Sequence, residues 1–114
     1  MTAKDFDKAL ALHQQGKTAE ALEAYLAILK NDSKNVNLLE LVAVAEAQLE
    51  QYQAAEKHLQ TALTIAPNKP SLLNNLGNLH HQQQANGKAE TAYLHAIKAD
   101  PSYANAYNNL GKLY

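Results

Sequence analysis

Apolar residues recur along the chain at the spacing of an α-helix, in pairs of segments that a short polar stretch separates. The separating stretches lie at Gly16, at 51–53 and at 85–87. We predict helices over residues 3–15, 18–31, 36–49, 53–66, 70–83, 87–99 and 104–114. Helices of about 12–14 residues are marginal alone in water, so packing on neighbouring helices must supply the stability.

The same pattern returns after 34 residues. The segment LLNNLGNLH at 72–80 reappears as AYNNLGKLY at 106–114, and Pro101 falls in the column of Pro67. With this period, residues 1–114 form one array of three full repeats and half a fourth, at 2–35, 36–69, 70–103 and 104–114. A fixed repeat of helix pairs predicts a solenoid in which each pair packs only on its neighbours.

The third repeat resembles the tetratricopeptide repeat in its signature positions. These positions hold Leu73, Leu76, Gly77, Ala89, Tyr93, Ala96 and Pro101. The resemblance implies an all-α fold, a right-handed superhelical solenoid of antiparallel helix-turn-helix hairpins with about seven helices. Because only small side chains fit where two helices approach closely, we expect Gly77 and Gly111 at helix crossings. We interpret all signature residues as packing residues.

The resemblance also implies a concave groove, lined by the first helix of each hairpin, that holds an extended peptide. Its apolar N-terminal part is predicted at Phe6, Leu10, Leu41 and Val44, and its polar part at Asn74, Asn75, Asn78, His81, Asn108, Asn109 and Lys112. An Asn amide donates and accepts, so it matches a peptide backbone of any sequence. Asn75 and Asn109, one repeat apart, resemble the asparagine ladders of tetratricopeptide arrays attached to glycosyltransferases. The alternative is that these amides only solvate an exposed helix face.

Two further interpretations of the groove concern its ligand. The apolar part receives an anchor of the ligand or a helix of the same or another chain, unless a local curl of the array covers it. Some tetratricopeptide domains hold the C-terminal carboxylate of chaperones with cationic side chains. Asn74 stands where that clamp needs Lys, and the chain has no Arg, so we do not expect this activity.

Charge and composition narrow the function further. The net charge is −1 and the ten basic residues are scattered Lys, whereas nucleic-acid binding needs a concentrated basic face. The absence of Cys excludes disulfides and thiol catalysis and fits a reducing compartment. No leader or membrane span is apparent, so we predict a cytoplasmic protein. No His pair has metal-ligand spacing, and no catalytic motif is present, so we expect no metal, no cofactor and no enzyme activity.

The two ends of the array differ in polarity. Asp5 and Lys8 occupy columns that are apolar in later repeats, which is expected of the first hairpin of an array. The last helix lacks a partner helix, and we expect Tyr107 and Leu110 to be buried while Ala106 and Leu113 are uncovered. This pattern indicates a fragment of a longer protein or an end that another molecule covers. It predicts that the chain dimerises weakly through that helix, or that the helix frays from residue 104 onward when the chain is dilute.

These observations predict a protein–protein interaction module or scaffold that binds a peptide or protein segment in its groove. One alternative is a non-catalytic, substrate-recruiting N-terminal arm of a larger enzyme of the glycosyltransferase or methyltransferase type. Another is a module for self-association.

Overall fold

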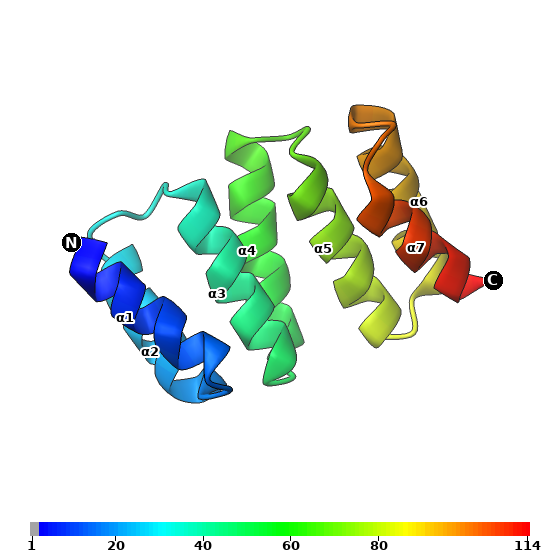
Figure 1. The fold of residues 1–114 in the computed structure, drawn as a ribbon. Coiled ribbons are helices and arrows are strands. Elements are labelled where there is room, and N and C mark those ends of the chain that lie inside the picture. Colours follow the sequence, from blue (N-terminus) through cyan, green and yellow to red (C-terminus); the bar gives the residue numbers. More distant parts are fainter. Residues whose placement is uncertain (1–2) are drawn as a thin grey trace. The chain divides into compact units, whose positions relative to one another are not determined.

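The computed structural model describes residues 3–114, and these form seven α-helices and no strand (Figure 1). The helices are α1 (Ala3–Gln14), α2 (Thr18–Leu29), α3 (Val36–Gln48), α4 (Tyr52–Ile65), α5 (Pro70–Gln82), α6 (Asn86–Ala99) and α7 (Ala104–Leu113). The all-α prediction is therefore confirmed. Each predicted helix is present, with ends that differ by two residues or fewer.

The 34-residue period is visible in the backbone of the turns. Gly16, Glu50 and Gln84 lie 34 residues apart and have positive φ angles of 82°, 62° and 63°. After each of them a backbone N–H reaches back five residues, as from Lys17 to the carbonyl of Leu12 at 2.9 Å. This left-handed cap ends a helix by satisfying its last carbonyls. The cap recurs at Glu50 and Gln84, which shows that the repeat fixes the conformation even without glycine.

Residues outside the core fix where helices begin. Pro70 is the first residue of α5, a position where a backbone N–H would have no partner within the helix, so its absence costs nothing. Asn35 caps α3 by accepting a hydrogen bond from the N–H of Leu38 at 3.1 Å. Ser102 does not cap the last helix. The hydroxyl of Ser102 donates instead to Asp100, at 2.7 Å, and Tyr103 precedes α7.

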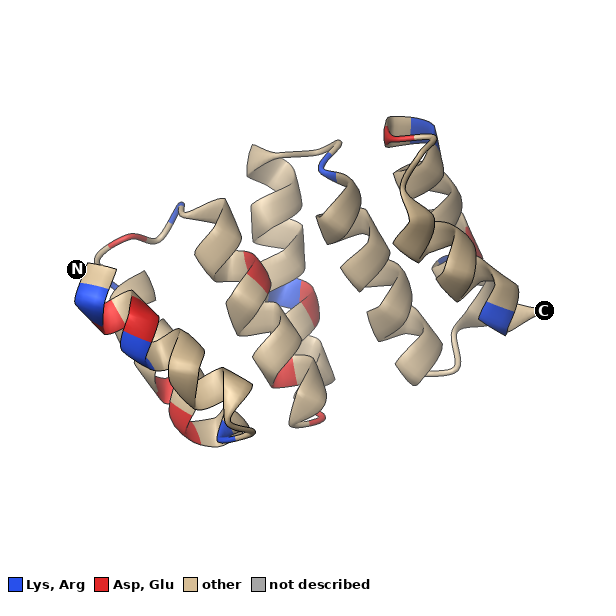
Figure 2. Cartoon of the chain, viewed as in Figure 1, with Lys and Arg blue, Asp and Glu red and all other residues tan. Residues whose placement is uncertain are grey.

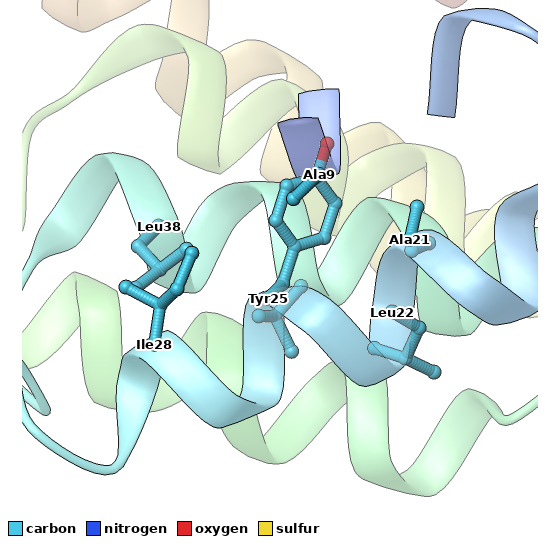
Figure 3. Close-up of a cluster of buried hydrophobic side chains, with 8 residues drawn as sticks. Ala9, Ala21, Leu22, Tyr25, Ile28 and Leu38 are labelled. Atoms are coloured by element: carbon cyan, nitrogen blue, oxygen red, sulfur yellow. The ribbon is translucent and has the colours of Figure 1, made fainter. Parts of the chain in front are cut away.

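The described chain divides into two compact units, one that ends at Ile65 and one from Ala66 to Tyr114. In the first unit α1 pairs with α2, α3 pairs with α4, and α2 packs against α3. Tyr25, Ile28 and Leu38 are buried together there, and the small side chains of Ala9 and Ala21 let α1 and α2 approach (Figure 3). The core of this unit therefore forms where α2 contacts both neighbours.

In the second unit α5 pairs with α6, and α7 packs mainly on α6. Gly77 lies at the crossing of α5 and α6, because a Cβ added to it would be only 2.5 Å from Cε1 of Tyr93. The prediction for Gly77 is confirmed. The prediction for Gly111 is wrong, since an added Cβ there meets no atom within 4 Å. Gly111 lies in the same column as Gly77, but no described helix crosses α7 at that point.

The predicted burial pattern of α7 is also wrong. Ala106 is fully buried, Tyr107 is 49% exposed, and Leu110 and Leu113 are both half-buried. The reason lies in a repeat position that the sequence analysis did not single out. This position holds Leu38, Leu72 and Ala106 in successive repeats, and all three side chains are fully buried. In α7, Ala106 is therefore covered by other helices, whereas Tyr107 is not.

Candidate peptide-binding faces

The first candidate face lies on α1 and α3, where the structure places the four predicted apolar residues. Phe6, Leu10, Leu41 and Val44 are all half-buried. Phe6 and Leu41 pack against the core cluster, and the ring centroid of Phe6 is 6.5 Å from that of Tyr25. These side chains thus divide their surface between the core and solvent, and they leave a partly apolar face.

A hydrogen-bonded chain that the sequence analysis missed joins α1 to α3. His13 Nε2 lies 2.7 Å from Oε1 of Gln48, and His13 Nδ1 lies 3.0 Å from the hydroxyl of Tyr25. Since Gln48 Oε1 can only accept, Nε2 carries a proton. Burial raises the pKa of the Tyr25 hydroxyl, which keeps it protonated as a donor to Nδ1. His13 therefore joins α1 directly to Gln48 at the end of α3, and the buried Tyr25 of α2 anchors its other ring nitrogen.

The second candidate face lies on α5 and α7. Asn109 Nδ2 donates to Asn74 Oδ1 at 3.0 Å, and this bond joins the two helices. Asn74 is only 5% exposed, so it holds Asn109 in place and offers little surface of its own. The two residues are 35 positions apart, as are His13 and Gln48. A side-chain bond of this separation thus links successive first helices in each of the two units.

Asn78 is held by a different partner. The hydroxyl of Tyr93 donates to Asn78 Oδ1 at 2.6 Å, and burial raises the pKa of that hydroxyl. Asn75 and His81 are half-buried, and Asn108 and Lys112 are exposed. Tyr93 of α6 thus holds the side-chain amide of Asn78, and Asn74 of α5 holds that of Asn109.

The second face carries little charge, and its amides offer both a hydrogen-bond donor and an acceptor. The bonds from Tyr93 and to Asn74 use one end of each amide, which leaves Asn78 Nδ2 as a donor and Asn109 Oδ1 as an acceptor. Helix α5 carries no Lys, Arg, Asp or Glu, and α7 carries only Lys112 (Figure 2). The face therefore suits a polar, uncharged or weakly acidic segment.

Comparison with known proteins establishes the family. A family model described as tetratricopeptide repeat matches residues 6–70 and 43–104, which together span most of the chain. The chain belongs to the tetratricopeptide repeat family. The burial of Tyr25, Gly77, Ala89 and Tyr93 fits the packing role of signature positions in such repeats.

Similar repeats occur in several kinds of protein. Over 62 residues the chain is 39% identical to the human protein O-mannosyl-transferase TMTC2, a match to 54% of this chain and 7% of that protein. The first TPR domain of Spaghetti (RPAP3), solved with the HSP90 peptide SRMEEVD, has a TM-score of 0.87 at 23% identity. That match covers 96% of this chain and 86% of the other.

A further similar structure is that of an O-GlcNAc transferase mutant from Thermobaculum terrenum. Its TM-score is 0.87 at 22% identity, and the match covers 99% of this chain but 23% of the transferase. At this identity, as for the RPAP3 domain, the likeness shows the tetratricopeptide solenoid fold alone. The chain spans a small part of both transferases, so the matches concern the repeats and not the whole of either protein.

Residues 3–114 hold neither a group of potential metal ligands nor a helix that could span a membrane. No three side chains of His, Asp or Glu gather there in a way that could hold a metal ion. None of the described helices combines the length and the hydropathy that crossing a bilayer requires.

The second repeat contains a buried acid that the sequence analysis did not identify. Glu46 on α3 is buried, and its Oε1 lies 2.7 Å from His58 Nδ1 on α4. Burial raises the pKa of the Glu46 carboxyl, and the hydrogen bond and charge of His58 oppose this effect. The equivalent residues of the first repeat are Leu12 and Ala24, so an apolar pair has been replaced by a polar one.

The raised pKa of Glu46 predicts how stability depends on pH. A carboxyl whose pKa is higher in the folded state stabilises the fold while protonated, and this contribution is lost as the pH rises through the folded-state pKa. In Glu46→Gln the amide oxygen still accepts from His58, but no charge is buried. We expect the unfolding free energy of Glu46→Gln relative to the parent to increase from about pH 4 towards neutrality. Urea unfolding of both proteins across this pH range tests this prediction. A difference between their unfolding free energies that shrinks with rising pH would contradict it.

Proposed function

We propose that this chain is a protein–protein interaction module that binds an extended polypeptide on the first helices of its repeats. The observation that carries the proposal is the pair of oriented amides on the second face. Asn78 Nδ2 and Asn109 Oδ1 offer one donor and one acceptor, and a peptide backbone presents the complementary acceptor and donor. Because Tyr93 and Asn74 already hold these amides, binding requires little further ordering of them.

The composition of the second face indicates the kind of segment that it accepts. Helices α5 and α7 present amides, His81 and the cation of Lys112, without an acidic residue. Recognition through amides depends on the peptide backbone more than on side chains, so we propose broad sequence tolerance with a preference against basic segments. The RPAP3 domain of the same fold was solved with a peptide that contains two adjacent glutamates. A weakly acidic ligand is compatible with Lys112 here.

Substitution of two amides tests this proposal. Peptides selected on the chain from a random displayed library would serve as ligands, with affinity measured by fluorescence anisotropy. Asn78→Ala combined with Asn109→Ala should weaken binding by about 0.5–1.5 kcal/mol for each hydrogen-bonded pair lost. The matched control is His95→Ala on α6, an exposed position outside the predicted faces, which should bind as the parent does. Unchanged affinity in the double variant, with the fold intact by circular dichroism, would eliminate the amide face as the binding site.

A second candidate function is a substrate-recruiting, non-catalytic arm of a larger enzyme. The match to an O-mannosyl-transferase favours this candidate, since it covers only 7% of that enzyme. In that case the bound polypeptide would be the substrate of a linked catalytic domain. The binding face and the variants above are the same, so the two candidates differ only in what is attached to the repeats.

The cytoplasmic location and the single continuous array of residues 1–114 remain predictions.

The homodimer predicted through the C-terminal helix also remains a proposal, with a changed contact surface. Ala106 is buried, so self-association would have to use the exposed rings of Tyr107 and Tyr114. Sedimentation of the chain over a wide concentration range tests it.

A further inference from the structure

The second and third repeats differ at two facing positions. In the second repeat, Glu46 on α3 faces His58 on α4, with Oε1 of the acid 2.7 Å from Nδ1 of the ring. The same two repeat positions of the third repeat hold His80 on α5 and Ala92 on α6. The third repeat therefore has an imidazole on its first helix, but only a methyl group where a side-chain partner of that imidazole would stand.

A cavity opens where the larger partner is missing. It has a volume of about 350 Å³ and lies within the second unit, between α5 and α6. Leu73, Leu76 and Ala92 form the apolar part of its lining. Small-molecule sites have volumes of roughly 300–1,000 Å³, so this cavity suits a compact ligand with a short aliphatic body.

The ring of His80 is nearly buried and has no partner. The residue is 9% exposed, and its ring makes no hydrogen bond within residues 3–114. No fully buried side-chain nitrogen or oxygen in this part of the chain lacks a partner, so the ring nitrogens of His80 must reach the cavity that it lines. A polar group that has lost most of its water without gaining a partner is unfavourable. A ligand with a hydrogen-bond acceptor would supply the missing partner.

The charges around the cavity favour an anionic acceptor. Lys88 and His95 line it and are exposed, and none of the described residues that line it is acidic. The contact of Glu46 with His58 shows that a carboxylate and an imidazole fit together at this place in the repeat. A carboxylate is thus the acceptor that satisfies both the charge and the geometry.

We propose that this cavity binds a small monocarboxylate with a short aliphatic body. The ring of His80 donates to the carboxylate, Lys88 adds an attractive charge, and the aliphatic body lies against Leu73 and Leu76. The cavity contains none of the amides that carry the proposed function, so either proposal can fail without the other.

The probe is 4-methylpentanoate, titrated into the full isotope-labelled chain and followed by NMR. We expect saturable shifts of the methyl signals of Leu73 and Leu76 and of the ring signals of His80. The matched control ligand is 4-methylpentanamide, which has the same body without the charge. It should bind roughly tenfold more weakly or worse, because hydrogen bonds to charged groups are the stronger ones. Acetate, which lacks the aliphatic body, should also bind more weakly.

Variants of the two facing positions test the assignment. His80→Leu copies Leu12, the residue at this position of the first repeat, so the fold should persist while the affinity for the acid falls at least tenfold. His80→Glu combined with Ala92→His rebuilds the pair of the second repeat, which should fill the cavity and abolish binding. Lys88→Gln should weaken binding, whereas Lys98→Gln, which removes an exposed charge of the same helix outside this cavity, should not.

Three results would overturn this proposal. One is equal binding of the acid and its amide, and another is unchanged affinity in His80→Leu with the fold intact by circular dichroism. The third is the absence of saturable shifts at Leu73, Leu76 and His80 at any soluble concentration of the acid. Shifts centred on Asn78 and Asn109 instead would belong to this third result, because they would place the acid on the amide face.

Discussion

Gly77→Leu is expected to destabilise the chain by about 1–3 kcal/mol or more, because it forces a side chain into the crossing of α5 and α6. A Cβ alone would come within 2.5 Å of Cε1 and 2.6 Å of Cδ1 of the Tyr93 ring. That ring is almost fully buried and its hydroxyl is bound to Asn78, so it cannot swing aside without breaking the bond. Thermal and urea unfolding would measure the loss.

The matched control is the same substitution at Gly111, one repeat later. Gly111 occupies the same column on α7, but a Cβ there meets no neighbour within 4 Å. Replacing glycine in an exposed part of a helix removes a helix-propensity penalty of up to about 1 kcal/mol. Gly111→Leu should therefore leave stability unchanged or raise it. Equal losses at both positions would mean that the effect of Gly77→Leu comes from the helix backbone and not from the crossing.

Tyr93→Ala is expected to cost about 3–5 kcal/mol, the range for truncation of a large buried aromatic side chain. The ring fills the space against Gly77, and its loss leaves a cavity and an unsatisfied Asn78. The measurement is again the unfolding free energy, with Tyr93→Phe as a control that keeps the ring and removes only the hydroxyl. We expect Tyr93→Phe to lose only about 0.5–1.5 kcal/mol.

The two predictions are coupled, which allows a double-mutant test. If Gly77 is required because of the Tyr93 ring, then Gly77→Ala should be costly in the parent and much less so in Tyr93→Ala. An interaction of this kind is expected between residues in direct contact. Additive losses would show that the two residues are not in contact in the way the structure places them.

Much of the fold follows from the sequence because the 34-residue period restricts each helix in several ways at once. Helical spacing, the turn at Gly16 and the prolines at 67, 70 and 101 agree on where elements begin and end. The left-handed caps at Glu50 and Gln84 were not evident, since neither residue favours a positive φ. Only their distance of 34 and 68 residues from Gly16 could have indicated them.

The burial of α7 could not be predicted correctly from signature residues alone. Those residues describe how the two helices of one hairpin pack, whereas α7 is buried only through its contacts with the preceding hairpin. The relevant column contains Leu38, Leu72 and Ala106, and its residues vary in size. Comparing all columns for apolar content, and not only those of the signature, would have shown it.

The sequence could place the candidate residues on their helices, but it could not indicate how their side chains are bonded. The columns place Asn74, Asn78 and Asn109 on first helices, but they do not show that Asn74 is nearly buried beneath Asn109. Nor do they show that His13 joins Gln48 and Tyr25. Side-chain pairs 35 residues apart depend on the offset of neighbouring helices, which sequence periodicity does not specify.

The most direct test of the central claim is a map of where a bound peptide contacts the chain. Peptides selected on the chain would be titrated into the isotope-labelled protein, and the side-chain amide signals of Asn78 and Asn109 would be followed by NMR. We expect saturable shifts of these two signals, smaller shifts of the backbone signals of Asn108 and Lys112, and none for Thr91 or His95 on α6. If the largest shifts occurred at Thr91 and His95, and the side-chain amide signals of Asn78 and Asn109 did not move at saturation, the proposed binding face would be wrong.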